Sequence, residues 1–179
     1  MDKKKVFSWT LYDWANSAFA TTVMAGFFPI FFEKYWSNPD FVDKSTFYLG
    51  LSNSVGSLIV AIMAPFLGAI SDTGSTKKKF LFTFAFLGIL STSLLFFVHQ
   101  GDWQLAAALY VVGAIGFSSG NVFYDSLLPS IAKKKDLDFV SSLGFVVGYL
   151  GGGILFVINI LMYQNPQWFG ISDAATAIR

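Results

Sequence analysis

Long apolar stretches separated by short polar segments make up most of this chain. Each must be a helix if it lies in lipid, because a helix satisfies its backbone polar groups within one segment. A helix needs roughly 20 residues to cross about 30 Å of hydrocarbon. The pattern therefore predicts an all-α fold, a polytopic transmembrane bundle with five spans. These are residues 14–32, 47–70, 80–98, 105–128 and 139–162.

The composition agrees with this membrane interpretation. The chain is 54% hydrophobic and 13% charged, whereas about a quarter of the residues in a soluble domain are charged. A net charge of +1 gives no reason to expect a nucleic-acid partner. The absence of cysteine excludes disulfides and thiolate metal sites within the chain, and we expect neither a metal nor a cofactor.

Lysine triplets indicate the orientation in the membrane. They precede the first, third and fifth spans, and they hold nine of the twelve basic residues: Lys3 to Lys5, Lys77 to Lys79 and Lys133 to Lys135. By the positive-inside tendency, the face that carries them is cytoplasmic, and so is the N-terminus. We expect a multi-pass protein of a bacterial cell membrane, with a vacuolar membrane as the alternative. The number of spans is odd, and the chain stops at residues 174–179, immediately after a polar stretch, so we expect a sixth span beyond residue 179.

Polar residues occupy one face of the first span. Asp13, Asn16 and Ser17 stand at i, i+3 and i+4, so they share a side of the helix. An aspartate at depth costs at least about 2.5 kcal/mol on insertion scales, and such residues usually face a cavity, a partner or a proton pathway. The alternative is that Asp13 lies at headgroup level, just before the span begins.

A similar group of residues stands near the cytoplasmic end of the fourth span. Tyr124 and Asp125 repeat the Tyr12–Asp13 pair, and Asn121 lies one turn from its aspartate, as Asn16 does. If spans one to three and four to six are internal repeats, these are corresponding positions, as in many transporters; coincidence is the alternative. We take seven residues as candidates for a solute cavity or for coupling to a proton or another ion: Tyr12, Asp13, Asn16, Ser17, Asn121, Tyr124 and Asp125.

Glycines mark one face of the fifth span. Gly144, Gly148 and Gly152 follow the small-xxx-small spacing, and Gly151 lies beside them. This spacing is typical of helices that approach a neighbour closely. We therefore predict helix packing along this face, with direct ligand contact as the alternative.

The segment between the second and third spans combines acidic and basic residues. It contains Gly68, Asp72 and the lysines Lys77, Lys78 and Lys79. Opposite charges at neighbouring helix ends could latch a cytoplasmic gate; a solvated loop is the alternative. Gly68 with Asp72 and a basic cluster resembles the loop signature of the major facilitator superfamily. The chain departs from that signature because Thr73, rather than arginine, follows the aspartate.

Three further segments resemble one branch of that superfamily, the vacuole effluxers, whose members include autophagy-related amino-acid effluxers. These are residues 8–19 (SWTLYDWANSAF), 123–129 (FYDSLLP) and 148–153 (GYLGGG). The resemblance implies a secondary transporter with twelve helices in two halves and alternating access. Residues 1–179 would then form most of the N-terminal half, with the sixth span and the C-terminal half absent. It also implies amino acids or similar small solutes as cargo.

Two other classes of protein remain open. An intramembrane enzyme of the aspartyl type would use Asp13 and Asp125, whereas Ser-His or metal chemistry has only His99 to draw on, at the outer end of span three. A complete small multispanning scaffold or subunit is the second alternative. We expect a transporter without enzymatic activity.

Overall fold

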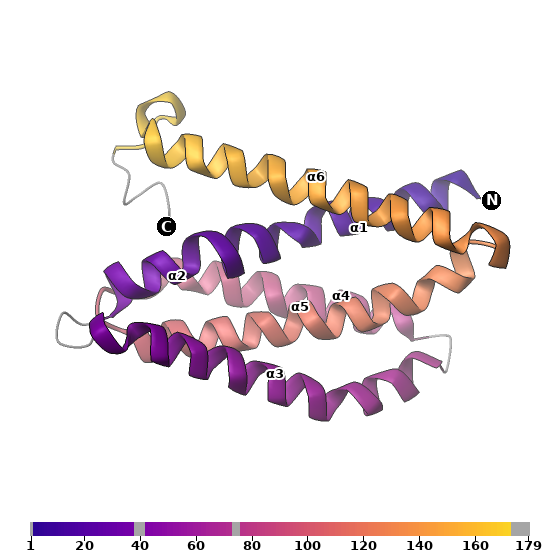
Figure 1. Ribbon diagram of the computed structural model, residues 1–179, viewed down its shortest axis with the longest axis horizontal. Coiled ribbons are helices and arrows are strands. Elements are labelled where there is room, and N and C mark those ends of the chain that lie inside the picture. Colours follow the sequence, from indigo (N-terminus) through magenta and orange to yellow (C-terminus); the bar gives the residue numbers. More distant parts are fainter. Residues whose placement is uncertain (1, 38–41, 73–75, 173–179) are drawn as a thin grey trace. The chain divides into compact units, whose positions relative to one another are not determined.

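The computed structural model describes residues 2–37, 42–72 and 76–172 as a set of helices (Figure 1). This part of the chain contains five helices long and apolar enough to cross a membrane, which confirms the predicted all-α, five-span fold. The chain divides into two compact units. One comprises residues 1–30 and 135–179, and the other comprises residues 31–134.

Each span is longer than the apolar stretch that predicted it. The first runs from Lys3 to Trp36 and the third from Lys77 to Phe97. The apolar pattern marks only the hydrocarbon region, whereas backbone hydrogen bonding continues into the polar interface. The elements of the five spans and their connections are α1 (Lys3–Ala18), η1 (Phe19–Phe27), α2 (Phe28–Phe31), η2 (Phe32–Trp36), α3 (Val42–Asp72), α4 (Lys77–Leu94), η4 (Leu95–Phe97), α5 (Trp103–Ile131), η5 (Lys134–Asp136), α6 (Leu137–Gln164) and η6 (Pro166–Phe169).

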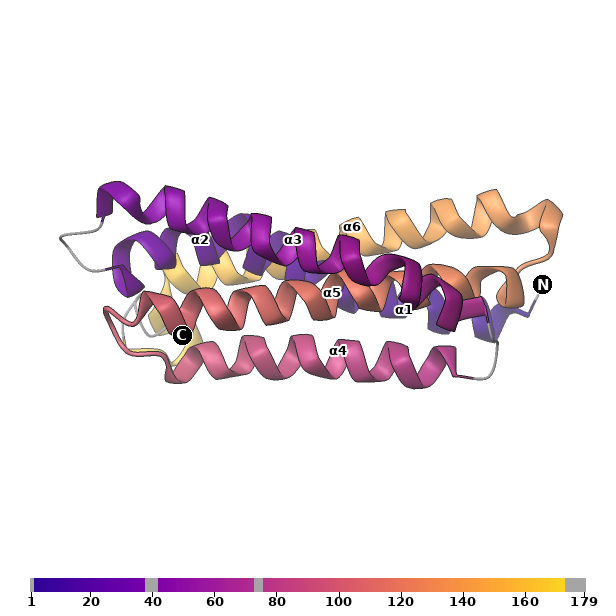
Figure 2. The same ribbon diagram turned by 90° about the horizontal axis from the view of Figure 1, so that it is seen from below.

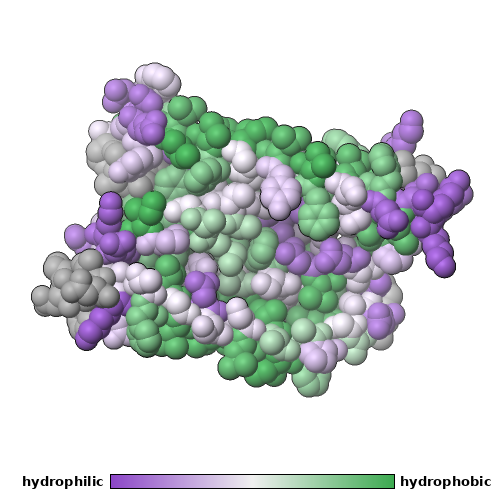
Figure 3. Space-filling view, viewed as in Figure 1, coloured by the Kyte–Doolittle hydropathy of each residue, from purple (hydrophilic) through white to green (hydrophobic). Residues whose placement is uncertain are grey.

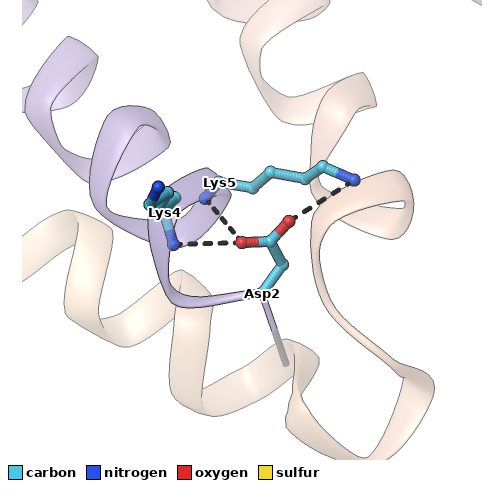
Figure 4. Close-up of polar contacts among 3 residues, drawn as sticks. All are labelled: Asp2, Lys4 and Lys5. Atoms are coloured by element: carbon cyan, nitrogen blue, oxygen red, sulfur yellow. Dashed lines mark hydrogen bonds and ion pairs between the residues drawn. The ribbon is translucent and has the colours of Figure 1, made fainter.

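The start of α1 is fixed by its N-cap. The Asp2 carboxylate accepts hydrogen bonds from the backbone N–H groups of Lys4 and Lys5, at 3.1 and 3.4 Å, and lies 3.7 Å from the Lys5 ammonium (Figure 4). A capping aspartate satisfies N–H groups that have no partner within the helix. The ion pair is exposed and contributes little, so the cap is the main reason that the helix begins here, before the apolar stretch.

In the first unit, α1 and η1 run alongside α6 (Figure 1). The backbones approach closely at Gly151, where an added Cβ would lie 2.5 Å from the Trp14 carbonyl oxygen. Further along, the rings of Phe27 and Phe156 meet edge to face, with 5.8 Å between centroids. The two helices run parallel, because residue numbers increase in the same direction on both from the first contact to the second. Large apolar side chains on the other faces of α6 remain exposed (Figure 3), as expected of a helix in lipid.

In the second unit, α5 packs against both α3 and α4 (Figure 2). Gly116 on α5 lies against Gly88 on α4, where an added Cβ would be 2.8 Å from the Gly88 nitrogen. Phe123 is fully buried and stacks on Phe80 and Phe84. At the other end of α5, the Trp103 ring stacks on Tyr48 of α3, with 4.3 Å between centroids. The three helices are thus held together in two ways. Small residues let the backbones of α4 and α5 approach, and stacked aromatic rings fill the contacts elsewhere.

Candidate functional site

Asp13 lies in the first helix of the first unit, one residue before the predicted apolar stretch at 14–32. The helix begins ten residues earlier, at Lys3, which places Asp13 roughly 15 Å along the helix axis at 1.5 Å per residue. The Ser17 hydroxyl donates to the Asp13 carboxylate at 3.5 Å. Both side chains are half-buried, as are those of Tyr12 and Asn16. The i, i+4 spacing therefore gives a polar pair on one face of α1.

Gly148 of α6 packs directly against this pair. A Cβ at Gly148 would lie 2.7 Å from the Ser17 hydroxyl oxygen and 2.9 Å from a carboxylate oxygen of Asp13. Any larger residue would have to push one of these side chains aside. The glycine predicted to serve helix packing thus also determines how much room the Asp13 carboxylate has.

Thr21 extends the polar line along α1, and the sequence analysis missed it. Its hydroxyl lies 3.1 Å from the Ser17 carbonyl oxygen and 3.2 Å from that of Gly152 across the interface with α6. An added Cβ at Gly152 would lie 2.9 Å from the Thr21 side chain. The sequence does indicate this position for Thr21, because Asp13, Ser17 and Thr21 are spaced at i, i+4 and i+8 and so share one face of the helix. Gly144, one turn before Gly148, is also buried.

In the second unit, the residues of the other Tyr–Asp pair have different surroundings. Tyr124 is buried, with 5% of its surface exposed, whereas Asp125 is exposed and Asn121 is half-buried. Asp13, by contrast, is half-buried against α6. The two tyrosine–aspartate pairs therefore share a sequence pattern but not a local environment.

A lysine joins α4 to α5 next to Asp125. The Lys77 ammonium donates to the carbonyl oxygen of Ser126 at 2.8 Å. Lys77 is half-buried, whereas Lys78 and Lys79 are exposed. The triplet is thus divided between one lysine that binds a neighbouring helix and two that extend outward.

The rest of the predicted gate segment lies at the end of α3. Asp72 is exposed there, and a Cβ added at Gly68 would meet nothing within 4 Å. Nearby, the Ser71 hydroxyl donates to the Gly68 carbonyl at 2.7 Å. Residues 73–75, where the chain departs from the superfamily signature, lie outside the described residues. Among the described residues, no group of three His, Asp or Glu side chains could hold a metal ion.

A second polar contact within the spans also escaped the sequence analysis. The Tyr110 hydroxyl of α5 donates to the Asn53 side-chain oxygen of α3 at 2.7 Å. Tyr110 is buried, with 3% of its surface exposed, whereas Asn53 is exposed. A single asparagine 57 residues from its partner gives no local pattern, so the pairing could be recognised only after the helices were packed.

Comparison with known proteins places these features in a family context. A family model described as "Vacuole effluxer Atg22 like" matches residues 41–173. The uncharacterized MFS-type transporter YxiO of Bacillus subtilis is 40% identical over 165 residues, which cover 92% of this chain and 39% of that protein. Autophagy-related protein 22 of Coccidioides immitis is 26% identical over 175 residues, covering 74% of this chain and 29% of that protein.

An uncharacterized protein of Aquifex aeolicus is 28% identical over 167 residues, covering 93% of this chain and 41% of that protein. The chain thus spans between 29% and 41% of the length of these relatives. No solved structure matches it.

Proposed function

The chain belongs to the vacuole effluxer Atg22-like family, and on this basis we propose that it contributes the N-terminal helices of a secondary transporter. The transporter would move small solutes by alternating access around a site near the middle of the membrane. The remaining helices, including a sixth span and a C-terminal half, would come from the same protein. Such a protein makes no covalent change to its solute, and nothing in the described residues favours an aspartyl enzyme over transport.

The observation that carries this proposal is the position of Asp13. A carboxylate at membrane depth is costly and is retained where it serves a solute, an ion or a proton. Here it lies on the face of α1 that also carries Asn16 and Ser17, and Gly148 limits the room around it. We propose that Asp13 is the coupling residue and that its carboxylate takes up a proton or another cation during the cycle.

The other candidate residues have supporting roles in this scheme. Asn16, Ser17 and Tyr12 would line the solute pathway beside Asp13, and Asn121, Tyr124 and Asp125 would do so on α5. Gly68, Asp72 and the lysines Lys77, Lys78 and Lys79 would form the cytoplasmic gate. The contact from Lys77 to Ser126 supports this role, because it joins the start of α4 to the end of α5.

Amino acids are the proposed cargo because the segments at 8–19, 123–129 and 148–153 resemble those of the vacuole effluxers, whose members include amino-acid effluxers. The matching family model and the relative named autophagy-related protein 22 agree with this branch. The relative YxiO comes from a bacterium and is named as an MFS-type transporter, which supports a bacterial cell membrane over a vacuolar one. The lysine triplets support a cytoplasmic N-terminus.

A counterflow assay tests this function. The protein, produced from its complete reading frame, is reconstituted in liposomes loaded with a mixture of unlabelled L-amino acids, and uptake of each labelled amino acid is measured. We expect counterflow of at least one amino acid. In Asp13→Asn, we expect proton-driven uptake to be lost while counterflow, which needs no net proton movement, is retained.

Asp138→Asn serves as the matched control, because Asp138 is an exposed carboxylate in the first turn of α6 and should leave both activities unchanged. The absence of counterflow for every amino acid would remove the substrate assignment. Proton-driven uptake that survives in Asp13→Asn would remove Asp13 from coupling.

A further inference from the structure

The hydrogen bond between Tyr110 and Asn53 fixes the orientation of a side-chain amide within the second span. The Tyr110 hydroxyl donates to the amide oxygen at 2.7 Å. An asparagine amide carries one acceptor oxygen and one NH2 group with two donors. With the oxygen bound to a buried tyrosine, the NH2 group is left to face away from Tyr110, where Asn53 is exposed.

The depth of Asn53 makes this exposure significant. The span runs from Lys44 to Asp72, so Asn53 lies roughly 14 Å along the helix from Lys44. An amide facing hydrocarbon at that depth would leave its donors unsatisfied at a cost of several kcal/mol. Its exposed face is therefore better suited to water or a polar solute than to lipid tails.

The residues around Asn53 separate into two faces. Gly50 and Ser57 lie one turn from Asn53, within about 60° of it around α3, and Ser54 lies about 100° away. Leu49 is also one turn from Asn53, but it is half-buried. Leu51 lies about 160° around the helix and is 49% exposed. Leu58 and Ile62 continue the exposed apolar side. The helix thus presents one polar face and a different apolar face that suits lipid.

Within the polar face, Asn53 is the side chain best placed to bind a solute. The Ser54 hydroxyl donates to the Gly50 carbonyl of its own helix at 2.9 Å, and the neighbouring Ser52 hydroxyl donates to Tyr48 at 2.8 Å. Each of these hydroxyls donates its one hydrogen to the backbone, whereas neither donor of the Asn53 NH2 group has a partner among the described residues.

From these observations, and resting on the proposed transport function, we propose that Asn53 lies in a water-filled solute pathway and donates to an acceptor oxygen of the solute, a carboxylate in the case of an amino acid. Tyr110 is a positioning residue, because it acts by holding the amide oxygen. An alternative occupant of this face is another helix of the same protein, which would exclude water from it.

Cysteine accessibility distinguishes these occupants without requiring transport. The chain contains no cysteine, and any elsewhere in the complete protein are replaced by serine. Asn53→Cys, Ser57→Cys and Leu51→Cys are each treated with a membrane-impermeant methanethiosulfonate in membranes. We expect the cysteines at 53 and 57 to react at least tenfold faster than the one at 51. Ser57→Cys leaves the Tyr110–Asn53 contact intact, so it serves even if the change at 53 impairs folding. Rates at 57 equal to or below the rate at 51 would overturn the water-filled pathway.

Protection from labelling tests the chemistry of the solute. A mixture of L-amino acids should slow the labelling of Ser57→Cys, which keeps the Asn53 amide, at least threefold, whereas a mixture of the corresponding amines, which lack the carboxylate, should not. Equal protection by both mixtures, or by neither, would overturn the assignment of a carboxylate. Failure of the transport proposal appears separately, as absent counterflow in the unmodified protein.

Discussion

The Lys77 ammonium at the start of α4 donates to the Ser126 carbonyl oxygen near the end of α5, at 2.8 Å. Pro129 follows three residues later in the same helix. A proline within a helix has no N–H to give to the carbonyl four residues before it, here that of Asp125, and its ring crowds this turn. Lys77 thus supplies a charged donor where the hydrogen bonding of α5 is weakened.

Removing this donor should destabilise the second unit. Lys77→Met keeps the length of the side chain but loses the hydrogen bond, and we expect a loss of about 1 kcal/mol, since the contact is only partly buried. Thermal unfolding of the detergent-solubilised protein measures the effect. Lys78→Met, at an exposed lysine of the same turn, should be neutral. Equal effects of the two substitutions would show that net charge, rather than the contact with Ser126, is responsible.

The crossing of α4 and α5 should tolerate alanine at one glycine and not at the other. At Gly116, a Cβ would lie 2.8 Å from two backbone atoms of α4, the Phe84 oxygen and the Gly88 nitrogen. Because backbone cannot move aside cheaply, we expect Gly116→Ala to cost about 1–3 kcal/mol. At Gly88, the nearest atom is 3.7 Å away, so Gly88→Ala should be neutral within error. The thermal midpoints of the two variants test this asymmetry, and a tolerated Gly116→Ala would contradict it.

A similar comparison applies along α6. A Cβ at Gly151 would lie 2.5 Å from the Trp14 carbonyl oxygen, whereas one at Gly153 would meet nothing within 4 Å. We expect Gly151→Ala to cost about 1–3 kcal/mol. Gly153→Ala should be neutral or stabilising by up to about 1 kcal/mol, because alanine favours the helix. Should Gly153→Ala prove the more damaging of the two in thermal unfolding, the packing of α1 on α6 described above would be wrong.

The Thr21 hydroxyl should contribute a small but measurable amount to the same interface. Thr21→Val keeps the shape and removes the contact with the Gly152 carbonyl. Hydrogen bonds between transmembrane helices contribute about 0.6 kcal/mol on average, and we expect a loss of that size. The control is Thr83→Val, because the exposed Thr83 hydroxyl bonds only to Lys79 of its own helix in the described contacts. A double-mutant cycle with Gly151→Ala reveals whether the two changes act on one interface; strict additivity would place them on independent ones.

Much of the candidate site could be predicted from spacing along one helix. Asp13 and Ser17 share a face at i, i+4, and the structure joins them by a hydrogen bond. The glycines of α6 were recognisable for the same reason, because a repeat of three or four residues places them in a row. Spacing along one helix could not predict which neighbouring helix each face contacts. The contact of Gly148 with Asp13 is an example, because nothing in the sequence specifies which helix a face will meet.

The sequence by itself determined that the described part of this chain contains five helices able to span a membrane, because hydrocarbon imposes a length and a composition that can be read one segment at a time. The tertiary structure decided which helices pair, and therefore which polar groups meet: Thr21 with Gly152, Lys77 with Ser126 and Tyr110 with Asn53. It also showed that the two tyrosine–aspartate pairs, which look alike in sequence, differ in burial. The physical reason is that such contacts depend on how backbones approach at small residues, which is a property of two helices together.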